Sequence, residues 1–556
     1  MPRSSIGLRD RESAALVSIT VFGSSGEVGG NQILVEGGCS RILLDFGSRM
    51  SFDSTYFSNF LNPRTNTELR DRLTLGALPV IPGIYNQRLF EPAGAELLSN
   101  DRHRHILTKG SRHFGHSVQT YGEWLAMEGK PFAEALFVSH AHLDHVGAIG
   151  YLDTAIPLYC TKDTKTVIET IDEILMFKTE ALESKVPYVA FYKKEGLEGI
   201  PKIAKEGTAR NCFTMADGET RNIGGMRVTL VEVDHSVPGA ASYIIETENK
   251  RILYTGDIRF HGTKPMTVDA FAARIGHVDL MICEGTRIDS DKKLTEKEIE
   301  LRIAEKVSTA SGLVLVDFGW KDTTRYETVR DAAKKASRTL VINARLARLL
   351  YRLGTYPAED ELVRVFLKRH TSALYSPKDY DGYELGLPDS PNCHYENGAL
   401  ADEIRANPGE YVMMFSYYDL GQLFDIIDDD GKLPGSWFIK AQCEPFSDEM
   451  EIDEERLIEW LKKFGIGFDA GGTPVPPDCA NPSCEKLRER IDRSHVSGHA
   501  SRPELKELIA KVAPKVLVPI HTNHPEMFAE LAREIADSGG PKIRVEVPEY
   551  GKPITA

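Results

Sequence analysis

Short apolar runs, most of them ending on a polar residue or glycine, recur through the first 300 residues of the chain. Runs of about four to eight apolar residues between turn-forming residues are typical of buried β-strands. The runs that we predict as strands lie at 15–22, 32–36, 41–46, 133–138, 227–233, 251–254 and 280–283. Five of them lead into side chains that can bind metals or protons: Asp45, a histidine cluster after residue 138, His235, Asp257 and Glu284. Because strand ends can converge on one edge of a sheet, these residues predict a common site.

The pattern changes near residue 300, where apolar runs begin to alternate with segments of helical spacing. The predicted strands lie at 312–316, 339–343 and 411–415, and the predicted helices at 323–336, 346–353 and around Leu423. This alternation indicates a separate α/β unit with a parallel sheet. An amphipathic helix is predicted at 504–512, and the apolar run after it ends on His521.

Length and composition narrow the class of protein. A chain of 556 residues is too long for a single core, and 41% hydrophobic with 27% charged residues is ordinary for a soluble globular protein. No apolar run approaches the ~18 residues that cross a bilayer, and the N-terminus has no apolar signal core, so we expect a cytoplasmic protein. The net charge of −15 argues against a nonspecific nucleic-acid binder. It does not exclude a nuclease whose basic residues line one cleft.

Residues 48–132 and 183–215 have the character of insertions. Two further groups of candidate ligands lie in polar parts of the chain, one of them in the first insertion. His103, His105, His113 and His116 stand among basic residues, with no carboxylate between them. This composition favours a solvated or substrate-facing loop over a metal site. The cysteines at 479 and 484 lie in a proline-rich loop without a second pair, so we expect neither zinc nor a disulfide there. Most of the eight cysteines are expected to be reduced core thiols.

The densest group of ligand types is His140, His142, Asp144 and His145, directly after a predicted strand. Imidazole nitrogens and carboxylate oxygens bind first-row divalent metals, above all zinc. In an extended loop alternate residues point the same way, so His140 and His142 can share one ion while Asp144 and His145 turn toward a second. A polar loop with chance histidines is the alternative. It is disfavoured because the chain has only 16 histidines in 556 residues.

These residues resemble a known set of motifs. The sequence from His140 to His145, followed by His235 and by Asp257 in Thr255-Gly256-Asp257, is similar to the metal-binding set of the metallo-β-lactamase fold. Asp45 resembles the aspartate that braces the ligand loop of that fold.

Three later motifs resemble those of the β-CASP nucleases. Glu284 lies in a segment similar to motif A, His499 in one similar to motif B and His521 in one similar to motif C. Within this family the ribonuclease J proteins are the most similar, through 26–29 and 495–501. No counterpart of their C-terminal domain is expected after His521. Their phosphate-binding stretch is not recognisable at 318–321, which leaves a requirement for a 5′ end open.

The resemblance implies the fold class and the division of the chain. We expect an α/β protein in which a metallo-β-lactamase αββα sandwich carries an inserted β-CASP α/β domain. The expected parts are 1–300 for the first part of the metallo-β-lactamase domain, 301–440 for the β-CASP domain and 441–556 for the closing part.

The resemblance also implies a role for each site residue. His140, His142 and His235 are expected to bind one Zn²⁺, and Asp144, His145 and His521 a second ion, where Mn²⁺ is an alternative; Asp257 is expected to bridge the two. Asp144 is further expected to orient the attacking hydroxide or accept its proton, and His499 to protonate the leaving 3′-oxygen. Glu284 is expected to hold the His499 ring. The expected contacts to the substrate phosphate are His495, Ser497, Gly498 and Ser501, although turn chemistry is an equal alternative for the serines.

We therefore expect a binuclear zinc-dependent ribonuclease that cleaves single-stranded RNA, with exonucleolytic and endonucleolytic action both open. No membrane partner is expected, and a homodimer stays open. A DNA nuclease of the same superfamily is one alternative, and His521 disfavours it because DNA-specific relatives tend to carry valine there. A catalytically silent RNA-processing subunit is another, and the complete set of ligands disfavours it.

Overall fold

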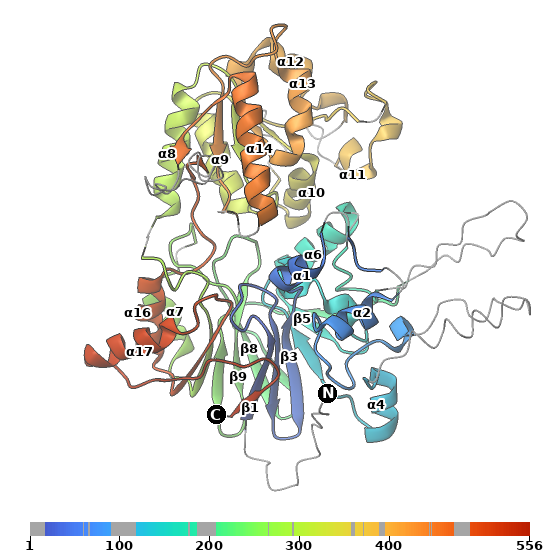
Figure 1. The fold of residues 1–556 in the computed structure, drawn as a ribbon, viewed down its shortest axis with the longest axis vertical. Helices are drawn as coiled ribbons and strands as arrows, with labels where there is room; N and C mark the ends of the chain where they lie inside the picture. The colour runs from blue at the N-terminus through green and yellow to red at the C-terminus, as the bar shows by residue number, and fades with distance from the viewer. Residues whose placement is uncertain are drawn as a thin grey trace, which may run out of the picture.

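The computed structural model describes residues 17–555, except for 59–60, 65–66, 91–117, 176–177, 186–206, 265, 292–293, 357–361, 371, 388–394, 444, 446–447 and 472–489. The four histidines between 103 and 116 and the cysteines at 479 and 484 lie outside the described residues. The described chain forms two lobes, one above the other in Figure 1. Two sheets build the lower lobe and one sheet builds the upper lobe.

Two seven-stranded sheets form the centre of the lower lobe. The strand order in the first sheet is β22 (Pro553–Thr555), β1 (Val17–Gly23), β2 (Gln32–Gly37), β3 (Ser40–Phe46), β4 (Ala135–Phe137), β5 (Leu158–Cys160) and β6 (Cys212–Thr214). The order in the second sheet is β21 (Arg544–Val545), β20 (Val516–Ile520), β11 (Leu280–Glu284), β10 (Arg251–Tyr254), β9 (Ala241–Glu246), β8 (Met226–Glu232) and β7 (Thr220–Ile223). The first and last of these strands along the chain, β1 and β22, pair antiparallel at one edge of the first sheet, so the two ends of the described chain lie side by side.

Helices cover the outer face of each sheet of the lower lobe (Figure 1). The helices on the first sheet are α2 (Glu68–Leu75), α4 (Tyr121–Glu128) and α6 (Lys162–Ile174), whereas α1 (Met50–Tyr56) has no buried residue and lies at the top of this lobe in Figure 1. The helices on the second sheet are α7 (Val268–Ile275), α16 (Arg502–Val512) and α17 (Met527–Asp537). Apolar side chains such as Ile19, Val228 and Ile282 fill the space between the sheets, and separate cores lie under the helices of each face. This arrangement confirms the predicted αββα sandwich.

The upper lobe contains one six-stranded sheet in which all pairs of neighbouring strands are parallel. The strand order is β14 (Val363–Val365), β13 (Thr339–Ile342), β15 (Tyr411–Met414), β12 (Val314–Asp317), β16 (Trp437–Lys440) and β17 (Gly467–Phe468). One core, which includes residues of α8 (Glu296–Thr309), α9 (Thr323–Lys335) and α10 (Ala344–Leu353), covers one face of the sheet. Another includes residues of α12 (Ala401–Ala406), α13 (Leu423–Ile426) and α14 (Asp448–Phe464). The predicted α/β unit with a parallel sheet is confirmed, whereas the domain divisions at 300 and 440 stay a prediction.

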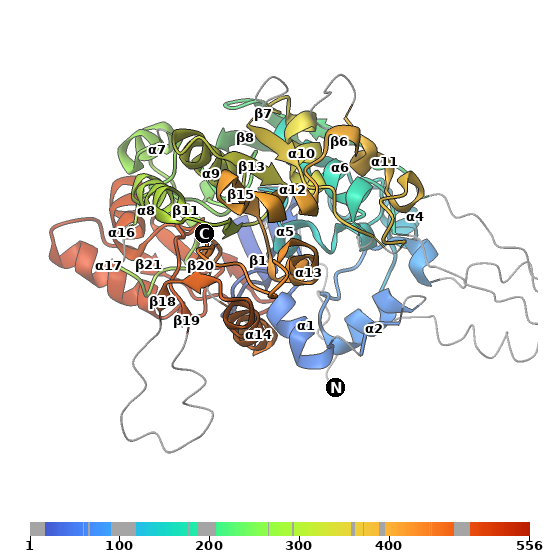
Figure 2. The ribbon, with the colours of Figure 1, turned by 90° about the horizontal axis from the view of Figure 1, so that it is seen from above.

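The two lobes meet at α6 and α10, which lie side by side when the molecule is seen from above (Figure 2). Leu349 of α10 is fully buried in the core that α6 shares with the first sheet. Around it, Arg348 pairs with Glu173, and Arg352 pairs with Glu169 and Glu173. A short antiparallel pair, β18 (Ala470–Gly471) and β19 (Arg490–Ile491), precedes the return of the chain to the lower lobe. None of the helices in the described ranges is both long and apolar enough to span a membrane.

Candidate metal centre

The predicted ligands come together at one edge of the lower lobe because their strands end there. β10, β11 and β20 run parallel to one another, so Asp257, Glu284 and His521 leave the second sheet on the same side. β8 is antiparallel to β9 and therefore parallel to β10, which brings His235 to that side as well. The loop after β4 delivers the cluster that begins at His140.

The ligand cluster is not a simple extended loop, contrary to our expectation. His142 has extended backbone, but the helical turn α5 (Leu143–Val146) begins immediately after it. After this turn, Asp144 and His145 belong to a different group of donor atoms from His140 and His142, although the centres of the His140 and His145 rings lie only 4.0 Å apart. The turn is tightly enclosed: a Cβ on Gly29 would lie 2.6 Å from an oxygen of the Asp144 side chain.

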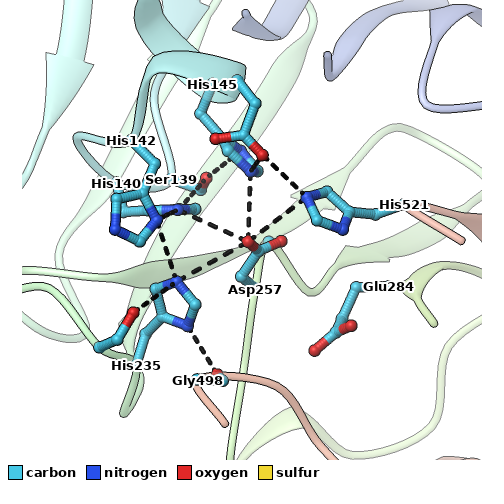
Figure 3. A network of polar contacts seen from close by, with 12 residues as sticks. Ser139, His140, His142, His145, His235, Asp257, Glu284, Gly498 and His521 are labelled. Carbon is cyan, nitrogen blue, oxygen red and sulfur yellow. Dashed lines mark hydrogen bonds and ion pairs between the residues drawn. The ribbon is translucent and has the colours of Figure 1, made fainter. Parts of the chain in front are cut away.

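One carboxylate oxygen stands at the centre of the site (Figure 3). The Oδ2 atom of Asp257 lies 3.3 Å from His145 Nε2 and 3.6 Å from Nε2 of both His140 and His521. The same oxygen lies 3.8 Å from His235 Nε2 and 3.9 Å from His499 Nδ1. Five imidazole rings from distant parts of the chain therefore surround a single buried oxygen.

The seven predicted metal ligands form two groups around this oxygen. In each group the nitrogen and carboxylate atoms lie within 4.8 Å of one another. The first group is His140, His142, His235 and Asp257; the second is Asp144, His145 and His521. A third combination, Asp257 with His499 and His521, shares residues with both. The structure thus brings together the residues that we assigned to each ion, although their role as ligands stays a prediction.

Asp45 holds the ligand loop from behind. Its side chain is fully buried and accepts hydrogen bonds from the Ser139 N–H and the Ser139 hydroxyl, both at 2.7 Å. It also contacts His145 Nδ1 at 2.7 Å and accepts a short hydrogen bond from the Tyr254 hydroxyl. These contacts fix the His145 ring so that its Nε2 atom faces Asp257.

Two other rings are held in the same manner. His235 Nδ1 lies 2.6 Å from the carbonyl oxygen of Gly498, and His521 Nδ1 lies 2.7 Å from the Thr286 hydroxyl. His521 also has a left-handed backbone, with φ of 53°. A residue other than glycine rarely adopts this conformation unless its surroundings impose it. In each ring the bonded nitrogen leaves Nε2 free to face the centre, which is the arrangement found around metal-binding histidines.

The donor atoms fit a divalent cation. His140 Nε2 lies 3.0 Å from His142 Nδ1, which in turn lies 3.3 Å from His235 Nε2, so ring nitrogens crowd together. Among the described residues, His145 Nε2 and Asp257 Oδ1 are buried and have no hydrogen-bond partner. Buried polar atoms normally have a hydrogen-bond partner, so a bound cation would account for these two. Several imidazole nitrogens together with carboxylate oxygens suit zinc, and the more oxygen-rich group also suits manganese.

The pKa values of the histidines agree with a divalent cation at this site. Burial lowers the pKa of His140 and His235 well below its usual value. Burial and then the Lys321 ammonium lower the pKa of His142 to about 3. These rings are therefore neutral, which is the form that binds a metal. Burial also disfavours a charged His145, but Asp257, Asp144 and Asp45 outweigh it and raise its pKa. That side of the site attracts positive charge.

His499 and Glu284 lie beside the candidate ligands. His499 Nδ1 is 3.4 Å from Glu284 Oε1, an ion-pair distance without hydrogen-bond geometry, since this nitrogen has no hydrogen-bond partner in the described part. Burial opposes a charged ring, but the Glu284 and Asp257 carboxylates outweigh it and raise the pKa of His499 to about 8. The arrangement is suited to a group that donates a proton near neutral pH.

The residues predicted to contact the substrate phosphate lie on the segment before α16. Ser497 accepts a hydrogen bond from the His499 N–H at 3.2 Å, and Gly498 is buried against His235. His495 is half-buried, and its Nδ1 atom lies 3.3 Å from the Ala441 carbonyl oxygen. Ser501 is fully buried and donates to Glu504, which is the turn role that the sequence left open. Contact of these four residues with a phosphate stays a prediction.

Sequence reasoning did not identify two residues of the site. Thr286 lies two residues after Glu284, in the segment similar to motif A, and its hydroxyl holds His521. Lys321 approaches from the upper lobe closely enough to act on His142 and Asp144, and burial lowers its pKa to about 8. A lysine two residues before the start of a predicted helix is an available signal, but only the packing of the lobes shows which site it faces.

Comparisons with known proteins agree with this geometry. Residues 126–314 match the family model described as a beta-lactamase superfamily domain, and residues 486–548 match the model described as a Zn-dependent metallo-hydrolase RNA specificity domain. The chain is 23% identical to Ribonuclease J of Sinorhizobium meliloti over 74% of its own length and 62% of that protein, which is less than two-thirds of the relative. It is 22% identical to Ribonuclease J of Pyrococcus abyssi over 72% of its own length and 77% of that protein.

A solved structure shares the fold over nearly the whole chain. The crystal structure of a protein of unknown function from Enterococcus faecalis V583 superposes with a TM-score of 0.64 and 20% sequence identity. The match covers 98% of this chain and 100% of that one. At this identity the match supports the arrangement of the two lobes and not an activity.

Proposed function

Because the chain belongs to the metallo-β-lactamase/β-CASP proteins that resemble ribonuclease J, we propose that it is a metal-dependent ribonuclease. One observation carries the proposal. His499 and His521, from the segment that matches the RNA specificity domain, meet the histidine cluster of the beta-lactamase domain around Asp257 Oδ2. Both halves of the match therefore contribute to one site.

Two divalent ions fit the donor groups. His140, His142 and His235 would hold the first ion, Asp144, His145 and His521 the second, and Asp257 would bridge them. We assign zinc to the first position, and zinc or manganese to the second. Bound there, the ions would supply Lewis-acid stabilisation of a phosphodiester and a nucleophile at neutral pH.

The side chains of the protein then move protons. Burial would raise the pKa of Asp144, but His145 and His521 outweigh it and lower its pKa, so this carboxylate is ionised and can accept the proton of an attacking water. The attack forms a bond from the water oxygen to phosphorus and breaks the bond from phosphorus to the 3′-oxygen. His499 would protonate that oxygen, since Glu284 keeps its ring charged near neutral pH. The products are a 5′-phosphate and a 3′-hydroxyl.

Phosphate binding is assigned to donors on the segment 495–501 and to Lys321. Ser497 and Gly498 lie next to His499 in sequence, and Lys321 acts on Asp144 from the opposite lobe. A phosphodiester strand lying between the lobes would therefore meet positive charge from above and the carboxylates with their ions from below. RNA is the proposed substrate because both relatives described above are named as ribonucleases, and we propose the single-stranded form because the resemblance of the motifs implies it.

The test uses RNA labelled at the 5′ end or internally, with monophosphate, triphosphate or hydroxyl 5′ ends, and DNA of the same sequence. The proposal expects cleavage of RNA that requires Zn²⁺ or Mn²⁺ and is lost in Asp144→Ala. Asp430→Asn, at an exposed acidic run in the upper lobe, serves as the control. Release of mononucleotides only from the monophosphate form would indicate 5′ exonuclease action. Cleavage of DNA alone, or full activity in Asp144→Ala, would refute the proposal.

A further inference from the structure

His261, four residues after Asp257, links the loop after β10 to the segment that carries His499. Its side chain is buried, with 5% of its surface exposed. The Nδ1 atom lies 3.0 Å from both carboxylate oxygens of Glu504, and the Nε2 atom lies 3.0 Å from the carbonyl oxygen of Ser497. His261 therefore bridges α16 and the backbone two residues before His499.

Both ring nitrogens of His261 face acceptors. A carboxylate and a carbonyl oxygen accept hydrogen bonds only, so the ring satisfies both when both nitrogens carry a proton. The bond to Glu504 is charge-assisted because its acceptor is a carboxylate, and it lies where little water competes, since Glu504 has 9% of its side chain exposed. Glu504 also accepts from the Ser501 N–H and hydroxyl, both at 2.8 Å, and so anchors the end of the segment.

The bond from His261 fixes the orientation of one peptide group. A trans peptide is planar, with its C=O and N–H pointing in opposite directions. Because the Ser497 C=O points toward His261, the Gly498 N–H points away from it. No described residue accepts a hydrogen bond from this buried N–H. The next carbonyl, that of Gly498, contacts His235 Nδ1 at 2.6 Å, so the free N–H lies between two anchored groups beside the metal centre.

We propose that His261, held by Glu504, is a positioning residue that orients the Gly498 N–H and His499 toward the substrate phosphate. The proposal rests on the proposed function. It assigns to the Gly498 N–H the role of a fixed donor for a nonbridging phosphate oxygen, where charge increases during attack. His261 itself touches neither substrate nor metal. Its effect passes through the Ser497–Gly498 peptide.

The contact is more than a helix cap. Ser501 and Glu504 satisfy each other in the capping arrangement at the start of α16 without help from His261. An amide at 261 that donates to Glu504 would leave that cap intact and would lose only the contact with the Ser497 carbonyl. The carbonyl of Ser497 would then be free to rotate together with the Gly498 N–H.

The test compares His261→Gln with His277→Gln, which replaces an exposed histidine after α7. An amide at 261 can donate at one end but places its own oxygen against an acceptor at the other. We expect kcat for RNA to fall about 10- to 100-fold in His261→Gln, because small displacements of positioned groups have effects of this size. The KM and the bound metal should match those of the control, and the melting temperature should fall by no more than about 4 °C.

A second variant and a second measurement separate positioning from loss of structure. Glu504→Gln keeps an oxygen for Ser501 but removes the charge, so it should lower kcat as His261→Gln does, and the double variant should show little further loss. In hydrogen exchange of the metal-free protein, amides at 496–500 should exchange faster in His261→Gln than in His277→Gln.

The outcomes distinguish this inference from the proposed function. Failure of the wild type to cleave RNA refutes the proposed ribonuclease, while hydrolysis of bis(p-nitrophenyl) phosphate and the exchange experiment still test the positioning role. An unchanged kcat, or unchanged exchange at 496–500, would overturn the inference. So would a parallel loss of metal and melting temperature in His261→Gln, because that result would make His261 a structural residue.

Discussion

Gly498→Ala tests how closely the segment before α16 is fitted to the metal centre. A Cβ at this position would lie 2.7 Å from His235 Cε1, 2.9 Å from His235 Nδ1 and 2.9 Å from the Ser236 hydroxyl. The backbone of Gly498 is not in the left-handed region, so the added methyl group acts through contact and not through backbone strain. The substitution therefore perturbs His235 and its neighbour Ser236 directly.

The size of the perturbation follows from these distances. Ordinary contact begins at 3.4 Å, so the buried His235 ring has to move by about 0.7 Å, or the segment has to move away from it. Metal–ligand distances tolerate only about 0.2 Å. We expect the affinity for the first ion to fall about 10- to 100-fold, as for disrupted neighbours of metal ligands. We also expect kcat to fall about 100-fold, because His499 shifts together with the segment.

The assay measures bound metal by inductively coupled plasma mass spectrometry after dialysis against graded chelator, together with RNA cleavage at saturating metal. Gly421→Ala is the matched control, because a Cβ at Gly421 meets nothing within 4 Å. A Gly498→Ala protein that retains metal and kcat at the level of this control would refute the close fit of the segment against His235.

Three further substitutions test other parts of the account. Asp45→Asn leaves buried donors without an acceptor and should cost about 3 kcal/mol of unfolding free energy in urea, while Asp430→Asn should cost under about 0.5 kcal/mol; equal values would contradict the bracing role. Leu349→Ala should cost about 2–5 kcal/mol and speed amide exchange in α6, and unchanged exchange there would argue against the contact between the lobes. Lys321→Ala should raise the KM for RNA about tenfold at low salt, whereas Lys335→Ala on the exposed face of α9 should not, and equal KM values would remove Lys321 from the phosphate path.

The sequence predicts which residues come together where a candidate ligand follows a strand. Asp257 and His521 each come directly after an apolar run, and parallel strands bring such positions to one edge of a sheet. The parallel sheet of the upper lobe is predicted from apolar periodicity, which reflects burial. The αββα layers are predicted from the resemblance of the site motifs to a known family.

The remaining features depend on contacts between distant segments. The helical turn at Leu143 and the left-handed backbone of His521 are imposed by packing, and no local pattern specifies them. The pairing of His261 with Glu504 spans 243 residues. Its only local signal is the Ser501-x-x-Glu504 spacing of a capping box, which predicts the helix start but not the histidine. Lys321 reaches the site because α6 and α10 place the upper lobe over it.

The most direct test of the central claim is a titration of metal-free protein with Zn²⁺, followed by the rate of single-stranded RNA cleavage. The account predicts no cleavage without metal and a rate that rises until about two ions are bound per chain, because each of the two donor groups holds one ion. Cleavage that persists in chelator, or a rate that is complete at one ion per chain, would contradict it.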